Sequence, residues 1–381
     1  MEPKRRDPLA IVLFVASLLL LGGSFLTVVS APTATLWIIA ILVGEWGHYA
    51  AIVALMIAAF AWKRSRVTTL VALLAAAFCI SPLLRAATIG RTLPQRCTDA
   101  FGLTSSDERP FSFAELFRRV PRNDVERSEH TYATDGTKSL KLDLYRRRDA
   151  TAPQPIIVMI HGGSWKGGKK SMLPAENYHL AHEGYAVAAI EYRRAPQSPF
   201  PAAVEDVFRA LDYLKAQSNE WHLDTTRIVF IGRSAGGQLA LSAAYSGREP
   251  NIRGVVSLYG PADLVLGYKR PSRRLVLNSR KVLEDYLGGS PNEQPQTYAA
   301  ASPINFINDT TPPTLLIHGL LDPIVWPDQS EVLAAKLRDA HRPHLLLELP
   351  WATHGCDANP SGPSGQLSSY AVDRFLAATL R

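Results

Sequence analysis

The chain has 381 residues, of which 47% are hydrophobic and 20% are charged, so it is too apolar to be disordered and long enough for two folding units. Its formal net charge is +7, and the first 96 residues hold +6 of this, with nine basic and three acidic residues. A nucleic-acid-binding protein carries its basic surface on the folded domain, whereas the rest of this chain is nearly neutral, which excludes that class of function.

The N-terminal quarter contains three apolar segments that are long enough to cross a membrane. Residues 9–30 hold no charged residue, residues 36–62 hold two ionisable groups, and residues 67–84 are again uncharged. About 20 apolar residues span a hydrocarbon core. We therefore predict a transmembrane region over residues 1–95, in which the third span extends to about residue 87.

A cleaved signal peptide is the alternative for the first segment, because Val29-Ser30-Ala31 resembles a cleavage site. Pro32 directly after that site and the two further apolar segments favour a membrane span instead.

The distribution of basic residues predicts the orientation of these spans. Lys and Arg favour the cytoplasmic side, and they cluster before the first span and between the second and third, but not in the loop at residues 31–35. Arg85, Arg91 and Arg96 oppose the rule but are outnumbered. The sequence thus predicts a multi-pass cell-membrane protein whose C-terminal domain lies outside the cytoplasm.

Two sets of polar residues leave alternatives open. Glu45 and His48 share one face of the second span, where an inter-helix hydrogen bond or a position near the membrane interface is favoured over a buried, proton-linked pair. Cys97 and Cys356 could form a disulfide outside the cytoplasm, but two free thiols are favoured. The cysteine and histidine spacings match no metal site, and we expect neither a metal nor an organic cofactor.

The linker, residues 96–128, is polar and contains one amphipathic pattern. Ser112 and Glu115 have capping-box spacing, and Pro121 would end the helix. The apolar residues that follow at helical spacing are Phe113, Leu116, Phe117 and Val120. We favour a helix docked on the next domain over a lid or a membrane-surface helix.

From residue 129 to the C-terminus, short apolar runs alternate with helical patterns. The predicted strands are Leu140–Tyr145, Ile156–Ile160, Ala186–Ile190, Ile228–Ile231, Val255–Leu258, Thr314–Ile317 and Leu345–Leu349. The predicted helices are Ala202–Ala216, Ala235–Tyr245, Gln329–Leu337 and Ser368–Leu380. This alternation predicts a doubly wound, mainly parallel α/β sheet preceded by the all-α transmembrane region, and ligands of such sheets bind beyond the carboxyl ends of the strands.

The strand ending at Ile231 is followed by a G-x-S-x-G pentad, Gly232 to Gly236. Ser234 would project from a sharp strand-to-helix turn, where the residues two before and two after it must be small. We predict that Ser234 is a catalytic nucleophile.

The strand ending at Ile160 is followed by His161-Gly162-Gly163-Ser164-Trp165. A glycine-rich turn lets backbone amides approach the oxygen on which acyl transfer builds negative charge. We expect the oxyanion hole to comprise the amides of Gly163, Ser164 and Ala235, and His161 to have a structural role.

The last two strands are followed by an acid and a base. Asp322 follows the strand ending at Ile317, and His354 follows the final strand, so the chain order of serine, aspartate and histidine is that of the α/β-hydrolase fold. Asp328 and Asp357 are alternatives for the orienting acid. His318 is expected to be a strand-end residue.

These motifs together resemble hormone-sensitive-lipase-like esterases of the α/β-hydrolase superfamily. The resemblance covers residue 129 to the C-terminus, with matching segments at Ala189–Pro196, Phe200–Ala203, Asp206, Arg227–Leu241 and Pro312–Asp322, and at the His354 loop. The HGG-x-W form at His161–Trp165 is more similar to feruloyl-esterase-like (BD-FAE type), isoprenylcysteine-methylesterase-like and kynurenine-formamidase-like relatives.

Three positions depart from the lipase pattern, namely Ser164 in place of Gly, Gln197 in place of Glu, and Arg233 where an acidic residue or Gln is common. We expect Arg233 and Trp165 to contact substrate. The basic run from Lys269 to Lys281 could receive an anionic substrate or face lipid headgroups, but a solvated excursion is favoured.

The sequence therefore predicts a membrane-anchored serine hydrolase that cleaves small-molecule or lipid carboxylic esters with Ser234, Asp322 and His354. An acyltransferase and an amidase or peptidase on the same fold are alternatives. A non-catalytic ligand sensor, such as the gibberellin receptor that resembles these esterases, is less favoured because all three triad residues are present.

Overall fold

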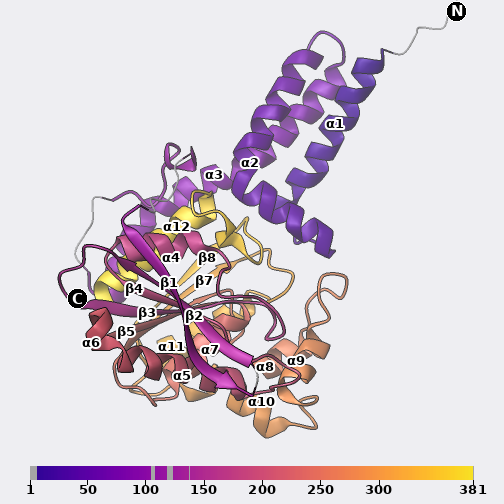
Figure 1. The fold of residues 1–381 in the computed structure, drawn as a ribbon. Helices are drawn as coiled ribbons and strands as arrows, with labels where there is room; N and C mark the ends of the chain where they lie inside the picture. The colour runs from indigo at the N-terminus through magenta and orange to yellow at the C-terminus, as the bar shows by residue number, and fades with distance from the viewer. Residues whose placement is uncertain (1–6, 104–107, 118–122, 137, 381) are drawn as a thin grey trace, which may run out of the picture.

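The computed structural model describes residues 7–103, 108–117, 123–136 and 138–380. Three long helices come first: α1 (Pro8–Ser24), α2 (Ala34–Ala61) and α3 (Arg66–Phe101), with the 3-10 turn η1 (Phe25–Thr27) after α1. They form a bundle that projects from the α/β domain, and all three are long and apolar enough to cross a membrane (Figure 1).

Each of these helices begins at a side-chain cap, and the bundle is packed through small residues. Asp7, Thr33 and Ser65 accept hydrogen bonds from the first turns of α1, α2 and α3, respectively. A Cβ on Gly47 of α2 would lie 2.7 Å from the Cys79 carbonyl oxygen of α3, so only glycine permits this close approach. Large apolar side chains are left to face outward, as in a membrane bundle.

The third helix runs farther than expected. The predicted span ends near residue 87, but α3 continues to Phe101, because its last turns have a second apolar surface to cover. Leu93 and Cys97 are fully buried in a core that covers one face of the sheet. One helix thus belongs both to the apolar bundle and to the α/β domain.

The domain contains one eight-stranded sheet with the order β1-β2-β4-β3-β5-β6-β7-β8. The pairs β1–β2 and β2–β4 are antiparallel, and the remaining pairs are parallel. The strands are β1 (Val125–Asp135), β2 (Lys138–Arg147), β3 (Gln154–Ile160), β4 (Ala186–Ile190), β5 (Leu223–Arg233), β6 (Ile252–Leu258), β7 (Thr314–Gly319) and β8 (His344–Leu349). The predicted mainly parallel α/β fold is confirmed.

Helices cover both faces of this sheet (Figure 1). They are α4 (Pro174–His182), α5 (Ala202–Ala216), α6 (Ser218–Trp221), α7 (Ala235–Tyr245), α8 (Leu264–Lys269), α9 (Ser279–Leu287), α10 (Pro295–Ala301), α11 (Asp328–Asp339) and α12 (Pro363–Thr379). Two cores result: α5, α7 and α11 pack on one face, while α3, α4 and α12 pack on the other. Neighbouring residues of β3 alternate between them, since Ile156 and Val158 enter the first core and Ile157 enters the second.

Some elements differ from the sequence-based expectation. The edge strand β1 was not predicted, because charged residues interrupt its alternation. In the linker, the structure has a 3-10 turn, η2 (Glu115–Phe117), where an amphipathic helix was expected, and the Ser112 hydroxyl accepts from the Ala114 amide instead of forming a capping box. Val120 and Pro121 lie outside the described residues.

Candidate active site

The turn between β5 and α7 holds Ser234 in a conformation that side chains rarely adopt, with φ 54° and ψ −121°. The strand and helix approach each other so closely that a Cβ on Gly232 would collide with the Gly236 carbonyl, and one on Gly236 would collide with the end of β3. The predicted need for small residues around Ser234 therefore has a direct steric cause.

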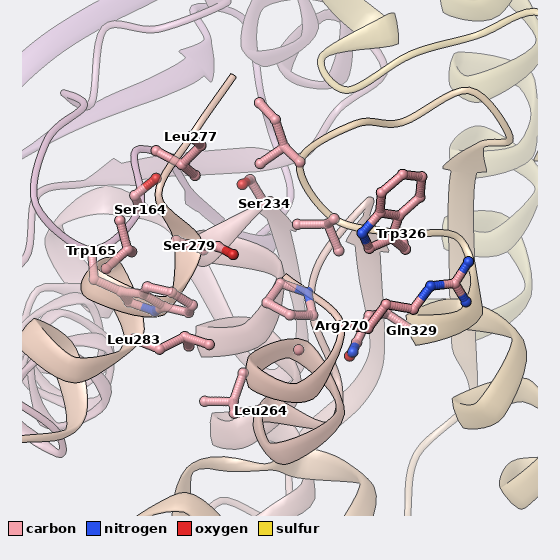
Figure 2. Close-up of a pocket in the computed structure, with 16 residues that line it drawn as sticks. Ser164, Trp165, Ser234, Leu264, Arg270, Leu277, Ser279, Leu283, Trp326 and Gln329 are labelled. Carbon is pink, nitrogen blue, oxygen red and sulfur yellow. The ribbon is translucent and has the colours of Figure 1, made fainter. Parts of the chain in front are cut away.

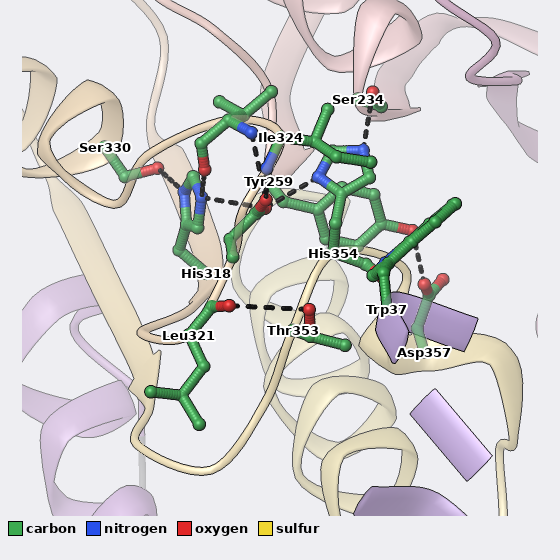
Figure 3. A network of polar contacts seen from close by, with 12 residues as sticks. Trp37, Ser234, Tyr259, His318, Leu321, Ile324, Ser330, Thr353, His354 and Asp357 are labelled. Atoms are coloured by element: carbon green, nitrogen blue, oxygen red, sulfur yellow. Dashed lines mark hydrogen bonds and ion pairs between the residues drawn. The ribbon is translucent and has the colours of Figure 1, made fainter. Parts of the chain in front are cut away.

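A chain of hydrogen bonds joins Ser234, His354 and Asp322. Figure 3 shows its link from Ser234 to His354. His354 Nε2 lies 2.8 Å from Ser234 Oγ, and His354 Nδ1 lies 2.6 Å from Asp322 Oδ2. With the Nδ1 proton donated to the carboxylate, Nε2 can accept the hydroxyl proton of the serine. Residues that are separated by up to 120 positions thus form one proton path at the carboxyl edge of the sheet.

Asp322 is held as a buried anion. Its side chain is fully buried, and its Oδ1 accepts hydrogen bonds from the amides of Ile324 (2.8 Å) and Val325 (2.9 Å). Burial by itself raises the pKa of Asp322, but attraction to His354 and hydrogen bonds with His318 and His354 outweigh it and lower the pKa from 3.8 to about 2. This carboxyl is therefore ionised across the whole neutral range and can fix the tautomer of His354.

The alternative acids have other partners. Asp328 pairs with Arg270, and Asp357 pairs with Arg233 and accepts a hydrogen bond from the Tyr259 hydroxyl. Among these three carboxylates, only Asp322 accepts a hydrogen bond from the His354 ring.

His318 is a buried strand-end residue, as expected. Its Nε2 lies 2.9 Å from the Val325 carbonyl oxygen and 3.4 Å from Asp322 Oδ2, and its Nδ1 lies 2.7 Å from the Ser330 hydroxyl. It therefore supports the turn that carries the acid.

The glycine-rich loop after β3 touches the turn of Ser234. Gly163, Ser164 and Trp165 have consecutive positive φ angles of 130°, 56° and 54°, and a Cβ on Gly162 would lie 3.1 Å from Cβ of Ser234. Ala235 is the first residue of α7, where amides have no acceptor within the helix. The three amides expected to bind an oxyanion thus belong to two turns in van der Waals contact.

His161 fixes this loop through its ring. Its Nδ1 lies 2.7 Å from the Gly162 carbonyl oxygen, and the ring stacks on Tyr192 with centroids 4.4 Å apart. Burial lowers the pKa of His161 from 6.5 to about 4, although the bond to Gly162 opposes the shift. The imidazole is therefore neutral at pH 7, in agreement with its predicted structural role.

A mainly apolar pocket opens beside Ser234 (Figure 2). Trp165 lines it and is held by stacking on Tyr286, with centroids 4.3 Å apart, and by an indole N–H bond of 2.9 Å to Gln238. The apolar wall comprises Leu264, Leu277, Val282, Leu283, Ile324 and Val325. The sequence reasoning missed this wall, although the spacing of Val282, Leu283, Tyr286 and Leu287 has the helical period that identifies α9.

The structure does not place Arg233 in this cavity. Its side chain is buried, lies against Met159 and forms an ion pair with Asp357. A guanidinium at this position compensates a buried carboxylate. The expected contact with substrate is therefore replaced by an internal ion pair.

The apolar helix α2 contacts the loop that carries His354, which the sequence reasoning also missed. The indole N–H of Trp37 donates to the His354 carbonyl oxygen at 2.9 Å (Figure 3). Eight residues along the helix, the Glu45 carboxylate accepts from the Ser364 amide at 3.1 Å, and the Glu45 carbonyl oxygen accepts from the Asn359 side chain at 3.1 Å. The residues from His354 to Ser364 are thus bonded to α2 at both ends.

The expected inter-helix hydrogen bond of Glu45 and His48 is not found. Glu45 bonds to the α/β domain, and neither ring nitrogen of His48 has a partner among the residues that the structure describes. His48 instead packs against the rings of Tyr49 and Phe117, with centroids 4.2 and 5.4 Å away. The thiols of Cys79, Cys97 and Cys356 are free and buried, as favoured from the sequence.

Comparison with known proteins identifies relatives of the whole domain. The sequence model of the BD-FAE family matches residues 142–337. The probable carboxylic ester hydrolase LipM of Mycobacterium tuberculosis is 29% identical over 349 residues, covering 83% of this chain and 80% of that protein. An acetyl-hydrolase of Streptomyces hygroscopicus is 31% identical over 245 residues, covering 60% of this chain and 77% of that protein.

Solved structures show the same fold. A bacterial heroin esterase superposes with a TM-score of 0.60 at 24% identity, covering 79% of this chain and 93% of that one. The hyperthermophilic esterase of the archaeon Pyrobaculum calidifontis gives a TM-score of 0.59 at 22% identity, with 78% and 99% covered. The match to LipM covers more of this chain than the residues after α3 can supply, so it includes residues of α3 or before it.

Proposed function

The chain belongs to the BD-FAE family and is a carboxylesterase-like hydrolase, and from this premise we propose that it cleaves carboxylic esters with Ser234 as nucleophile, His354 as general base and Asp322 as the orienting acid. The observation that carries the proposal is the continuous hydrogen-bond chain from the serine hydroxyl to the buried carboxylate. All three side chains are held in place before substrate arrives.

The reaction proceeds through an acyl-enzyme. Ser234 Oγ attacks the ester carbonyl carbon while His354 Nε2 takes its proton, and the imidazolium then gives that proton to the leaving alcohol. Water attacks the acyl-enzyme by the same route and releases the acid. Asp322 stays ionised throughout and stabilises the imidazolium.

The amides of Gly163, Ser164 and Ala235 stabilise the oxyanion in both steps. Loss of one such donor typically costs on the order of 3 kcal/mol in transition-state stability. The apolar cavity beside Ser234 accommodates an apolar portion of the ester, and Trp165 contributes to its wall.

The first experiment tests the nucleophile. A fluorophosphonate probe is expected to label the solubilised chain. Ser234→Ala is expected to abolish this labelling and to lower kcat for p-nitrophenyl butyrate by several orders of magnitude. Ser242→Ala, in the middle of α7, is the matched control and retains both. Labelling that persists in Ser234→Ala would refute the assignment, and equal cleavage of the matching anilide would favour an amidase.

The membrane region of the proposal comprises residues 1–95 with α1, α2 and the first part of α3 as spans, and the hydrolase domain comprises residues 129–381. Asp7 and Arg64 lie 4.0 Å apart, so the start of α1 and the basic α2–α3 connection share one end of the bundle, while the domain lies at the other (Figure 1). The positive-inside rule places the basic end in the cytoplasm and the domain outside it.

Protease added to intact cells that express the chain tests this orientation. We expect digestion of the α/β domain without permeabilisation, and protection of the α2–α3 connection. A domain that is digested only after permeabilisation would reverse the orientation.

A further inference from the structure

The segment between α8 and α9 reaches the turn between α1 and α2. The Ala34 amide at the start of α2 donates a hydrogen bond of 3.1 Å to the Leu275 carbonyl oxygen. Figure 1 shows the same approach, with the loop before α9 extending toward the domain-side end of α1 and α2. Leu275 is therefore tied to one end of the apolar bundle.

The length of α1 sets the depth of this contact in a bilayer, because α2 is kinked at Trp46. With the 3-10 turn that follows it, α1 covers the 20 residues Pro8–Thr27, or about 30 Å, which matches the hydrocarbon thickness of a bilayer, and Asp7 before it lies 4.0 Å from Arg64. The basic residues Lys63 and Arg64 follow the far end of α2. If they lie in one headgroup layer, Ala34 and with it Leu275 lie in the opposite one.

The side chains at this depth suit a lipid surface. Leu275 is 72% exposed, whereas the next most exposed large apolar side chain among the described residues after 129 is Met172 at 41%. The structure gives no acidic partner to Arg273 or Arg274 in its described part, whereas the neighbouring Arg270 pairs with Asp328 and Lys281 pairs with Asp285. Arg273 lies over the Trp326 ring, 5.7 Å from its centroid, a contact that leaves its positive charge without a counter-anion. Two guanidinium groups without a described carboxylate partner, beside an exposed leucine, complement lipid phosphates above an acyl layer.

The same segment leads directly to the cavity beside Ser234. Arg270, Leu277 and Ser279 line the cavity on either side of residues 273–275 (Figure 2). A substrate that enters past this segment therefore comes from the headgroup layer.

We propose that Arg273, Arg274 and Leu275 form a docking surface for the anionic headgroups of the bilayer that the chain spans, and that the cavity takes amphiphilic esters from that surface. This inference rests on the proposed membrane insertion and ester hydrolysis, and it narrows the substrate class to esters that partition into lipid. The arginines bind phosphate, the leucine enters the acyl boundary, and the ester group moves along the loop to Ser234.

A depth measurement tests the docking surface without using activity. The full chain carrying Leu275→Cys, labelled with the fluorophore NBD and reconstituted into nanodiscs of phosphatidylcholine and phosphatidylglycerol, is expected to be quenched by a headgroup spin-labelled lipid. The three native thiols are buried and do not compete for the label. Lys336→Cys on α11 is the control and should stay unquenched; equal quenching at both positions, or none at Leu275→Cys, would overturn the proposal.

A kinetic measurement tests the substrate class. In the double variant Arg273→Gln/Arg274→Gln, KM for 4-methylumbelliferyl oleate in nanodiscs that contain phosphatidylglycerol is expected to rise on the order of fivefold per arginine. KM should be unchanged in pure phosphatidylcholine, as should hydrolysis of water-soluble p-nitrophenyl butyrate. Lys336→Gln/Arg338→Gln removes the same charge from exposed positions on α11 and should have no effect.

The outcomes separate the inference from the function on which it rests. Equal loss toward both esters, or no dependence on phosphatidylglycerol, would overturn the docking surface while leaving the hydrolase intact. If the unaltered chain cleaves neither ester, the proposed function fails, and the quenching result still decides whether residues 273–275 meet the lipid.

Discussion

Burial decides the charge of the polar residues around Ser234. Asp322 and His161 are both inside the domain, but they have opposite partners. Two backbone amides and two histidines stabilise the charged form of Asp322, whereas His161 has a carbonyl oxygen and an aromatic ring as neighbours and is neutral. The same low dielectric thus keeps one group ionised and the other uncharged.

The neutral state of His161 predicts a loss of stability in acid. Its pKa is about 4 in the folded chain and 6.5 when unfolded, so the unfolded state binds a proton first as pH falls. The contribution of neutral His161 to the free energy of unfolding is complete above pH 6.5. It is lost progressively as the pH falls to 4, by about 3 kcal/mol in total. The thermal midpoint at pH 7.5 and at pH 4.5 measures this loss. His161→Phe, which retains a ring to stack on Tyr192, should show a smaller difference between these two midpoints than the unaltered chain. An equal difference would assign the acid sensitivity to other groups.

At the scale of elements, Ser234, Asp322 and His354 each lie just after the end of a strand. Further contacts hold each of them in place there. The turn after β5 is constrained by its close contact with the end of β3. The turn after β7 is fixed by the amides of Ile324 and Val325, which donate hydrogen bonds to Asp322. The loop after β8 differs because a helix from the apolar bundle supports it. His354 is therefore the member of the proposed triad whose position depends on α2.

This dependence predicts a kinetic effect of Trp37→Phe. The substitution removes the indole N–H that binds the His354 carbonyl oxygen but keeps an aromatic ring. A hydrogen bond of this kind is worth about 1 kcal/mol, so kcat toward p-nitrophenyl butyrate should fall about fivefold with KM unchanged, because the cavity wall is not altered.

Trp62→Phe is the matched control, since Trp62 caps the other end of α2 and is 69% exposed. A rise in KM without a change in kcat, or an equal effect of both substitutions, would contradict the support of His354 by α2.

For the whole molecule, α3 is the element that unites the apolar bundle and the hydrolase domain. Its first half packs against α1 and α2, and its second half fills a core beneath the sheet with α12. Arg96 of this half also donates a hydrogen bond of 2.6 Å to the Leu346 carbonyl oxygen of β8. The two parts of the chain are thus joined by a continuous helix and a shared core.

Leu93→Ala tests this shared core. Leu93 is fully buried, and truncation of such a leucine typically costs about 2–5 kcal/mol, so the thermal midpoint of the solubilised chain should fall by several degrees. Leu84, nine residues earlier and 58% exposed, provides the control, and Leu84→Ala should leave the midpoint nearly unchanged. Similar midpoints for the two variants would mean that α3 contributes little to the domain.

The sequence by itself was sufficient wherever a local pattern determines the structure. The parallel strands are continuous apolar runs, so their places were predicted to within a few residues, and helices 202–216 and 235–245 agree with α5 and α7. Ser234, Asp322 and His354 could be selected because each follows a strand, and parallel strands bring their carboxyl ends to one edge. These features depend on periodicity and on steric limits within a few residues.

Only the tertiary structure decided the features that depend on contacts between distant segments. The pairing of Arg233 with Asp357, the bond from Trp37 to the His354 loop and the contact of Ala34 with Leu275 join residues more than 120 positions apart. An arginine beside Ser234 has the same local pattern whether it faces substrate or a buried carboxylate. The choice between them is set by which side chains the folded chain brings together, because the free energy of a buried charge depends on its neighbours in space.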